Sequence, residues 1–131
     1  MDQKDKNNGL LASIADYISI ARPDHWFKNV FILPGLIVPF GLSPHMKMPS
    51  LWAFMAGVIS ICLIASSNYV INEILDAPSD KHHPKKRNRP IPSGRVKLPL
   101  AYAEWWLLMF VGLGLALTVS AGYFWTMFVL W

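Results

Sequence analysis

Residues 48–72 read MPSLWAFMAGVISICLIASSNYVIN, a run of 25 residues without a single Asp, Glu, Lys or Arg. A helix of about 20 apolar residues is long enough to cross the hydrocarbon core of a bilayer. Residues 29–46 and 105–131 also lack these charged side chains, over 18 and 27 residues, so that the three runs hold 70 of the 131 residues. The sequence therefore predicts an all-α integral membrane protein. It argues against a soluble domain, a disordered chain and a disulfide-stapled secreted module.

The distribution of basic residues predicts how the chain lies in the membrane. Only 15% of the residues are charged, whereas about a quarter are charged in a typical soluble domain. Seven of the twelve Lys and Arg lie between Lys81 and Lys97, and short cytoplasmic loops carry an excess of such residues. We therefore expect the N-terminus and a loop over residues 76–98 to be cytoplasmic, at the inner membrane if the protein is bacterial, and we expect no nucleic-acid partner. The single cysteine, Cys62, excludes an intramolecular disulfide.

The expected organisation is a polytopic transmembrane helical bundle with three complete spans and the start of a fourth. Residues 1–9 are polar and predict a disordered tail, and residues 10–131 form the membrane domain. An amphipathic surface helix is expected over residues 10–21, ended by Arg22-Pro23 because a residue before proline avoids the helical region. The spans are expected at about residues 27–42, 51–75, 99–121 and, incomplete after a break at Gly122, 123–131.

An acidic stretch, residues 72–80, begins at the end of the second expected span and continues beyond it. If the helix continues through it, Asn72, Asp76 and Asp80 are spaced i, i+4 and i+8 and share one face. Two carboxylates one turn apart repel each other unless a cation lies between them, and Mg²⁺ is usually held by one or two carboxylates together with substrate phosphates. Pro78 could end the helix before Asp80. The alternative is that these are ordinary acids at a membrane exit.

A basic, proline-containing run comes next, from Lys81 to Arg95. Acids followed directly by Lys and Arg fit a polyphosphate site, in which cations hold the outer phosphate oxygens. Arg22 and Lys28 are expected on the same side of the membrane and could add phosphate contacts. The alternatives are that the run sets topology and meets lipid headgroups, and that Arg22 and Lys28 are snorkelling interfacial cations.

These residues resemble a known family. NEILDAPSDKHHPKKRNRPIPSG, residues 72–94, is similar to the first acidic signature, N-D-x-x-D-x-x-x-D, and the following R-P-[IL]-x-[ST]-G loop of the UbiA-type membrane prenyltransferase superfamily. Glu73 replaces the second-position Asp. The resemblance implies nine transmembrane helices around a central cavity, Mg²⁺ as cofactor and a second acidic signature between later helices. Since this chain contains no second signature, it resembles the N-terminal part of such an enzyme, and we expect it to be inactive alone.

A second stretch points to one branch of the superfamily. ARPDHWFKN, residues 21–29, and the H-P-x-K-R pattern of residues 83–87 are similar to the branch that includes decaprenyl-phosphate phosphoribosyltransferase. This resemblance implies transfer of phosphoribose from phosphoribosyl diphosphate to a polyprenyl phosphate. Prenyl transfer from a polyprenyl diphosphate to an aromatic or quinone acceptor is the alternative within the fold. A non-catalytic membrane subunit with a lipid-binding loop is the alternative from another class.

The resemblance also assigns roles to individual residues. The expected partners are the bilayer, a diphosphate donor, and a polyprenyl phosphate or diphosphate lipid. The implied catalytic residues are Asn72, Asp76 and Asp80. The implied Mg²⁺ ligands are these three residues and Glu73. The implied phosphate-binding residues are Arg22, Lys28, Lys85, Lys86, Arg87 and Arg89.

Overall fold

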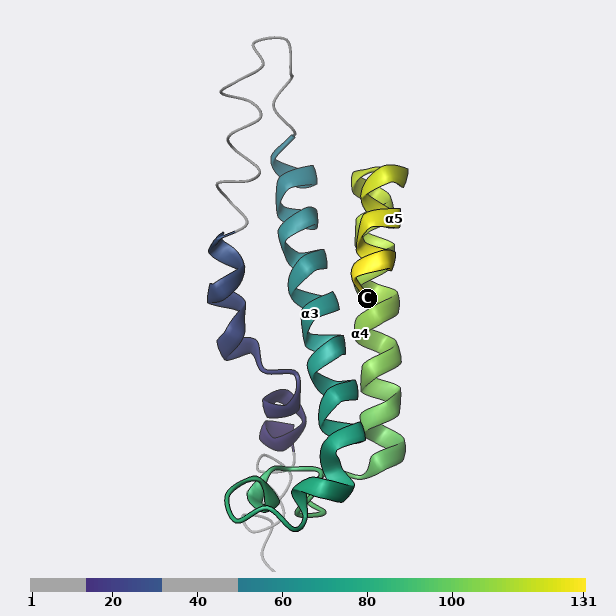
Figure 1. The fold of residues 1–131 in the computed structure, drawn as a ribbon. Coiled ribbons are helices and arrows are strands. Elements are labelled where there is room, and N and C mark those ends of the chain that lie inside the picture. Colours follow the sequence, from purple (N-terminus) through teal and green to yellow (C-terminus); the bar gives the residue numbers. More distant parts are fainter. Residues whose placement is uncertain (1–13, 32–49) are drawn as a thin grey trace, which may run out of the picture. The chain divides into compact units, whose positions relative to one another are not determined.

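The computed structural model describes residues 14–31 and 50–131, and all regular secondary structure in these two ranges is helical (Figure 1). The prediction of an all-α chain is confirmed. Besides the short helix over residues 14–20, the elements are η1 (Pro23–Phe31), α3 (Leu51–Asp80), η2 (Lys86–Asn88), α4 (Leu98–Val119) and α5 (Ala121–Leu130). The expected tail and most of the first expected span lie outside the described residues.

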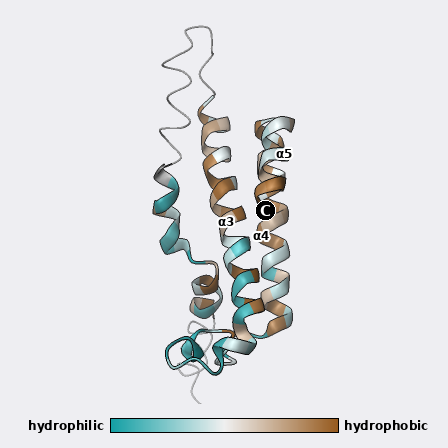
Figure 2. Cartoon of the chain, viewed as in Figure 1, coloured by the Kyte–Doolittle hydropathy of each residue, from teal (hydrophilic) through white to brown (hydrophobic). Residues whose placement is uncertain are grey.

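Helix α3 is the longest element, with 30 residues. At 1.5 Å per residue it extends over about 45 Å, which is longer than the hydrocarbon core of about 30 Å. The hydropathy colouring in Figure 2 changes along the helix, from mainly brown in its N-terminal part to interspersed teal near its C-terminal end. Helices α3 and α4 are each long and apolar enough to cross a membrane. A span placed in the apolar part of α3 leaves its last turns outside the hydrocarbon.

The C-terminal end of α3 lies five residues beyond the expected end of the second span. Pro78 does not interrupt the helix, which continues to Asp80. Helical hydrogen bonding persists past the proline, because the Lys81 amide donates to the Ala77 carbonyl at 3.2 Å. The stretch expected to begin a loop at Asp76 is therefore helical, and Asn72, Asp76 and Asp80 do follow one another at one-turn intervals.

The chain forms two compact units, each with its own apolar core. The first unit contains the described residues up to Pro23 together with residues 66–108, and the second contains residues 24–31, 50–65 and 109–131. The core of the first unit joins the end of α3, the start of α4 and the connecting loop. It is formed by Ile20, Val70, Ile74, Ala77, Ile91, Val96 and Ala101.

In the second unit, small residues let α3 approach α4 and α5 closely. The Ser60 hydroxyl donates to the Gly112 carbonyl at 2.8 Å, and the Tyr123 hydroxyl donates to the Gly57 carbonyl at 2.8 Å. These bonds satisfy polar groups that would be costly to leave unpaired in a membrane. The core of this unit is formed by Ile64, Met109, Leu113, Ala116 and Met127.

The break between α4 and α5 lies at Ser120, two residues before the expected position at Gly122. Ser120 is extended, and its hydroxyl accepts a hydrogen bond from the Tyr123 amide at 3.0 Å. A serine at this position satisfies one of the free amides at the start of a helix. The N-cap decides where the new helix begins, and Gly122 is simply part of the first turn of α5.

The close approach at Gly112 gives a stability prediction. A Cβ at Gly112 would lie 3.1 Å from two side-chain carbons of Ile64, whereas a Cβ at Gly114 would meet nothing within 4 Å. We expect Gly112→Leu to lower the free energy of unfolding by about 1–3 kcal/mol through overpacking. The matched variant Gly114→Leu should unfold at or above the wild-type temperature. Thermal unfolding of the detergent-solubilised protein measures both, and equal midpoints for the two variants would contradict the packing described here.

Candidate functional site

A polar pocket of about 210 Å³ lies in the first unit, at the C-terminal turns of α3. It contains three of the four residues expected to bind Mg²⁺ and two of the six expected to bind phosphate. The lining residues are Arg22, Tyr69, Asn72, Glu73, Asp76 and Arg89. The structure thus gathers acidic and basic side chains that come from three separate parts of the chain.

The spacing along α3 explains why four of these residues face the same pocket. Tyr69, Asn72, Glu73 and Asp76 are spaced i, i+3, i+4 and i+7, which is the pattern of one helical face. Tyr69 was not among the expected site residues. Its position one turn before Asn72 is the signal in the sequence that identifies it.

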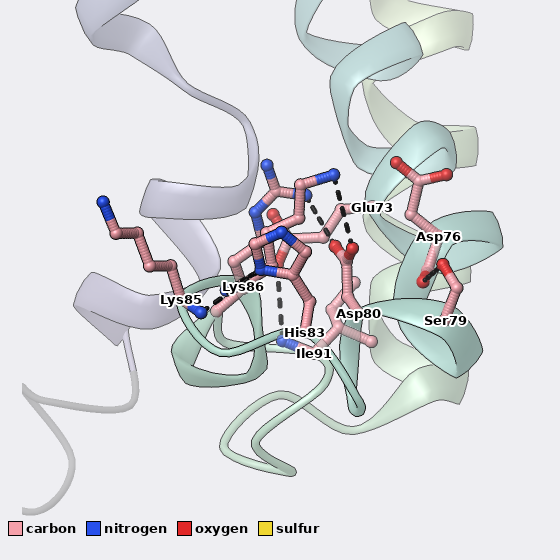
Figure 3. A network of polar contacts seen from close by, with 9 residues as sticks. Glu73, Asp76, Ser79, Asp80, His83, Lys85, Lys86 and Ile91 are labelled. Carbon is pink, nitrogen blue, oxygen red and sulfur yellow. Dashed lines mark hydrogen bonds and ion pairs between the residues drawn. The ribbon is translucent and has the colours of Figure 1, made fainter.

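Of the four expected metal ligands, Asn72 and Asp76 are exposed. The Ser79 hydroxyl donates to the backbone carbonyl of Asp76 at 3.0 Å, a contact drawn in Figure 3. Among residues 14–31 and 50–131, no ion pair or hydrogen bond engages the Asp76 carboxylate. Both of its oxygens therefore remain available to a ligand in the pocket.

Glu73 is almost fully buried, with 4% of its surface exposed. Its Oε1 accepts a hydrogen bond from the backbone amide of Ile91 at 3.3 Å (Figure 3). Ile91 is itself part of the apolar core. Glu73 thereby ties the loop after α3 to the helix while it still lines the pocket.

Asp80 is also buried, but it does not line the pocket. Its Oδ2 lies 2.7 Å from Nη1 of Arg89, and its Oδ1 lies 3.5 Å from Nζ of Lys86. In Figure 3 the Asp80 carboxylate points toward the Lys86 ammonium. Both oxygens therefore meet cations of the following loop. The expected roles of Asp80 as a metal ligand and of Lys86 as a phosphate contact stay predictions.

The loop that carries Arg89 is folded back on α3 by its R-P-I-P-S-G sequence. Gly94 has φ +79°, a left-handed conformation that glycine adopts without strain. Its amide donates to the Ile91 carbonyl at 3.0 Å, and the Val96 amide donates to the Pro90 carbonyl at 3.2 Å. These turns bury Ile91 and Val96 in the core, which fixes the backbone on the C-terminal side of Arg89.

The helix over residues 14–20 packs against the same loop. The Tyr17 hydroxyl accepts a hydrogen bond from the Lys97 amide at 3.2 Å, and Asp16 Oδ1 lies 3.1 Å from Nε of Arg95. Ile20 is fully buried in the core of this unit. The sequence pattern indicated an amphipathic helix here, but it did not indicate that Asp16 and Tyr17 bind the loop some 80 residues away.

Arg22 follows this helix and reaches the pocket. Its backbone has φ +49°, a conformation that is unfavourable for a residue with a Cβ. Its guanidinium lies 5.7 Å from the centre of the Tyr69 ring, within the distance at which a cation is attracted to an aromatic face. The surface helix was expected to run to residue 21 and to be ended by Arg22-Pro23, and in the structure it ends at Ile20.

Besides Lys86, three other expected phosphate-binding residues do not line the pocket. Lys85 and Arg87 are exposed in the loop. Lys28 is exposed in the part of η1 that belongs to the second unit, and its Nζ lies 6.0 Å from the centre of the Phe27 ring. Their phosphate contacts stay predictions.

The residues of the pocket fit Mg²⁺ by their chemistry. Asn72, Glu73 and Asp76 offer amide and carboxylate oxygens, and Mg²⁺ prefers oxygen ligands and usually keeps several waters or substrate phosphates. In the part of the chain that the structure describes, no group of three or more His, Cys, Asp or Glu is placed to hold a metal ion. If Mg²⁺ is held here, Asn72, Glu73 and Asp76 would supply only part of its coordination sphere, and water or phosphate oxygens would complete it.

Comparison with known proteins identifies the family. The chain is 35% identical over 108 residues to nodulation protein NoeC of Azorhizobium caulinodans, with 81% of this chain and 33% of the relative covered. It is 28% identical over 120 residues to decaprenyl-phosphate phosphoribosyltransferase of Mycolicibacterium smegmatis, covering 82% of this chain and 38% of the relative. It is also 28% identical over 104 residues to 4-hydroxybenzoate octaprenyltransferase of Aeromonas hydrophila, covering 79% and 36%.

The chain spans about a third of the length of these relatives. The family model for UbiA prenyltransferases matches residues 30–131, which include α3, the basic loop, α4 and α5. This match covers well over half of the chain and includes all pocket residues except Arg22. The acidic stretch and the basic loop that suggested the resemblance lie within it. The chain belongs to the UbiA prenyltransferase family.

Proposed function

We propose that the protein is a Mg²⁺-dependent membrane transferase that binds a diphosphate donor in the α3 pocket and transfers phosphoribose from phosphoribosyl diphosphate to a polyprenyl phosphate. The observation that carries the proposal is the pocket itself. There, Asn72, Glu73 and Asp76 on α3 meet the guanidinium groups of Arg22 and Arg89. The chain spans about a third of the length of its relatives. The activity is therefore proposed for the complete product of the gene and not for residues 1–131 alone.

The pocket combines the two kinds of group that a diphosphate needs. Asn72, Glu73 and Asp76 would hold Mg²⁺, which supplies charge neutralisation on the departing diphosphate when it is bound. Arg22 and Arg89 would donate paired N–H groups to phosphate oxygens, an arrangement for which the planar guanidinium is well suited. Such donors favour the reaction if they are in place before negative charge develops.

The proposed reaction exchanges one C–O bond for another. The bond between the anomeric carbon and the diphosphate breaks, and its electron pair leaves with the diphosphate. The carbon then has oxocarbenium character, and a phosphate oxygen of the polyprenyl phosphate forms the new C–O bond. Arg22 and Arg89 would stabilise the leaving group in this step, and burial at the membrane would keep competing water away.

The choice of donor rests on two observations. The segment that contains Arg22 and Lys28 is similar to the phosphoribosyltransferase branch, and a relative with that name matches over most of this chain. The match to 4-hydroxybenzoate octaprenyltransferase favours a second candidate, which is prenyl transfer from a polyprenyl diphosphate to an aromatic acceptor. Both candidates use a diphosphate leaving group, so the pocket has the same task in each.

We also propose that residues 81–97 face the cytoplasm. Seven cations lie in this stretch, and an excess of Lys and Arg is typical of cytoplasmic loops. A soluble donor such as phosphoribosyl diphosphate would then reach the pocket from the cytoplasm. The lipid acceptor would reach it from the bilayer.

A direct assay tests the proposed reaction. Membranes from cells that express the gene should convert radiolabelled phosphoribosyl diphosphate and decaprenyl phosphate into a labelled lipid in the presence of Mg²⁺. Removal of Mg²⁺ by a chelator should reduce the rate about 100-fold or more. Membranes carrying an empty vector are the control. If label passes to no polyprenyl phosphate, but a polyprenyl diphosphate is consumed with a phenolic acceptor, the second candidate replaces the first.

A further inference from the structure

Asp80 differs from the other acids at the end of α3 in its surroundings. It is 2% exposed, and its two oxygens face Arg89 and Lys86. Asp76, one turn earlier on the helix, is exposed and has no such partner among the described residues. Two carboxylates that belong to the same sequence pattern therefore have different neighbours.

The ion pair with Arg89 connects Asp80 to the pocket. Arg89 lines the pocket, whereas Asp80 does not. The distance of 2.7 Å between Asp80 Oδ2 and Arg89 Nη1 is that of a charge-assisted hydrogen bond. This bond uses one amino group of the guanidinium. A guanidinium carries five N–H groups in total, and no other partner engages the Arg89 side chain within residues 14–31 and 50–131, so the remaining groups are open to a ligand.

We propose that Asp80 is a positioning residue, which holds the Arg89 guanidinium at the pocket so that it can bind the diphosphate of the donor. This inference rests on the proposed function of the pocket. Asp80 acts through Arg89, while Asn72 and Asp76 bear directly on the metal and the phosphates. The acidic pattern of α3 thus divides into a part that faces the ligand and a part that orients a basic side chain.

The ion pair with Asp80 restricts the Arg89 side chain before any ligand binds. An arginine side chain loses considerable rotational freedom when a ligand immobilises it, and the ion pair has already restricted this freedom in the free protein. Lys86, three residues before Arg89, also forms an ion pair with Asp80, which holds this part of the loop against α3. Glu73 contributes from the other side by binding the Ile91 amide, two residues after Arg89. The loop is thereby attached to α3 on both sides of the guanidinium.

Binding of inorganic pyrophosphate to the detergent-solubilised protein tests the inference, because both candidate donors contain this group. Calorimetry should show that Asp80→Asn and Arg89→Gln each weaken pyrophosphate binding about 10-fold at saturating Mg²⁺. The double variant should bind no more weakly than Arg89→Gln alone, since Asp80 then has no guanidinium to position. Asp80→Glu should recover part of the affinity, and Lys81→Gln, which removes an exposed neighbouring charge, should bind like the wild type.

The Mg²⁺ concentration that half-saturates pyrophosphate binding separates positioning from metal ligation. It should stay unchanged in Asp80→Asn and rise in Asp76→Asn. If it rises equally in both variants, Asp80 is a metal ligand. If Asp80→Asn and Arg89→Gln weaken binding additively, Asp80 acts independently of Arg89. Either result overturns the inference.

Limited trypsin digestion keeps this test independent of the proposed function. If the wild type binds no pyrophosphate, the proposed function of the pocket fails, and the role of Asp80 in holding the loop is read from cleavage after Lys85, Lys86 and Arg87. Faster cleavage in Asp80→Asn than in Lys81→Gln supports the ion pair as the element that orders the loop. Equal cleavage in the two variants overturns it.

Discussion

Asp76→Asn is expected to lower the rate of the proposed transfer about 100-fold or more at a fixed Mg²⁺ concentration. The substitution removes a negative charge from an exposed carboxylate at the pocket without changing its size. Loss of a metal-binding carboxylate reduces both the affinity for the ion and the stabilisation of the leaving diphosphate. Part of the rate should return at high Mg²⁺ concentration, so the measurement is a Mg²⁺ titration of the initial rate.

The fold should not change in this variant, because an exposed substitution away from packing contacts usually alters stability by less than about 0.5 kcal/mol. The matched control is Asp24→Asn, which removes another exposed carboxylate, in η1, where it lies 3.4 Å from Nε2 of His25. This control should keep the wild-type Mg²⁺ dependence. An Asp76→Asn enzyme with the same rate and the same Mg²⁺ titration as wild type would contradict the proposed metal site and favour a non-catalytic role.

The sequence was sufficient to predict those parts of the site that lie on one helix. Asn72 and Asp76 share a helical face because they are one turn apart, and the helix holds this register past Pro78. The all-α class followed from the charge-free runs, since a membrane-spanning segment must satisfy its backbone internally. These inferences depend only on the geometry of a single helix and on the burial of apolar side chains away from water.

Contacts between α3 and the loop that folds back on it could not be predicted from the spacing of residues in the sequence. Asp80 was grouped with Asp76 by spacing, yet Arg89 and Lys86 return to it through a loop. The path of that loop depends on the turns at Gly94 and on the burial of Ile91. The break at Ser120 was missed for a different reason. The hydroxyl of Ser120 caps α5 and decides where this helix starts, whereas the prediction relied on the nearby Gly122.

Substitution of Arg22 is expected to have the second large effect on activity. Its variants can separate the contribution of backbone strain to stability from the contribution of the side chain to ligand binding. Its φ of +49° is unfavourable for a residue with a Cβ, by about 1–2 kcal/mol. Glycine adopts this conformation freely, but it also makes the unfolded chain more flexible. We expect Arg22→Gly to keep the free energy of unfolding within about 1 kcal/mol of the wild type. The same variant should reduce kcat/KM for the donor about 10- to 100-fold, because the pocket loses a guanidinium.

Arg22→Lys completes the comparison, because it keeps the positive charge but loses the planar group that lies over Tyr69 and can hold two phosphate oxygens. Its kcat/KM should fall between those of the wild type and Arg22→Gly, while it retains the strained backbone. Thermal unfolding and donor kinetics on the three proteins then rank them differently. A role confined to structure would make activity follow stability across the series, whereas direct phosphate binding requires the most active variant to be the one that keeps the charge.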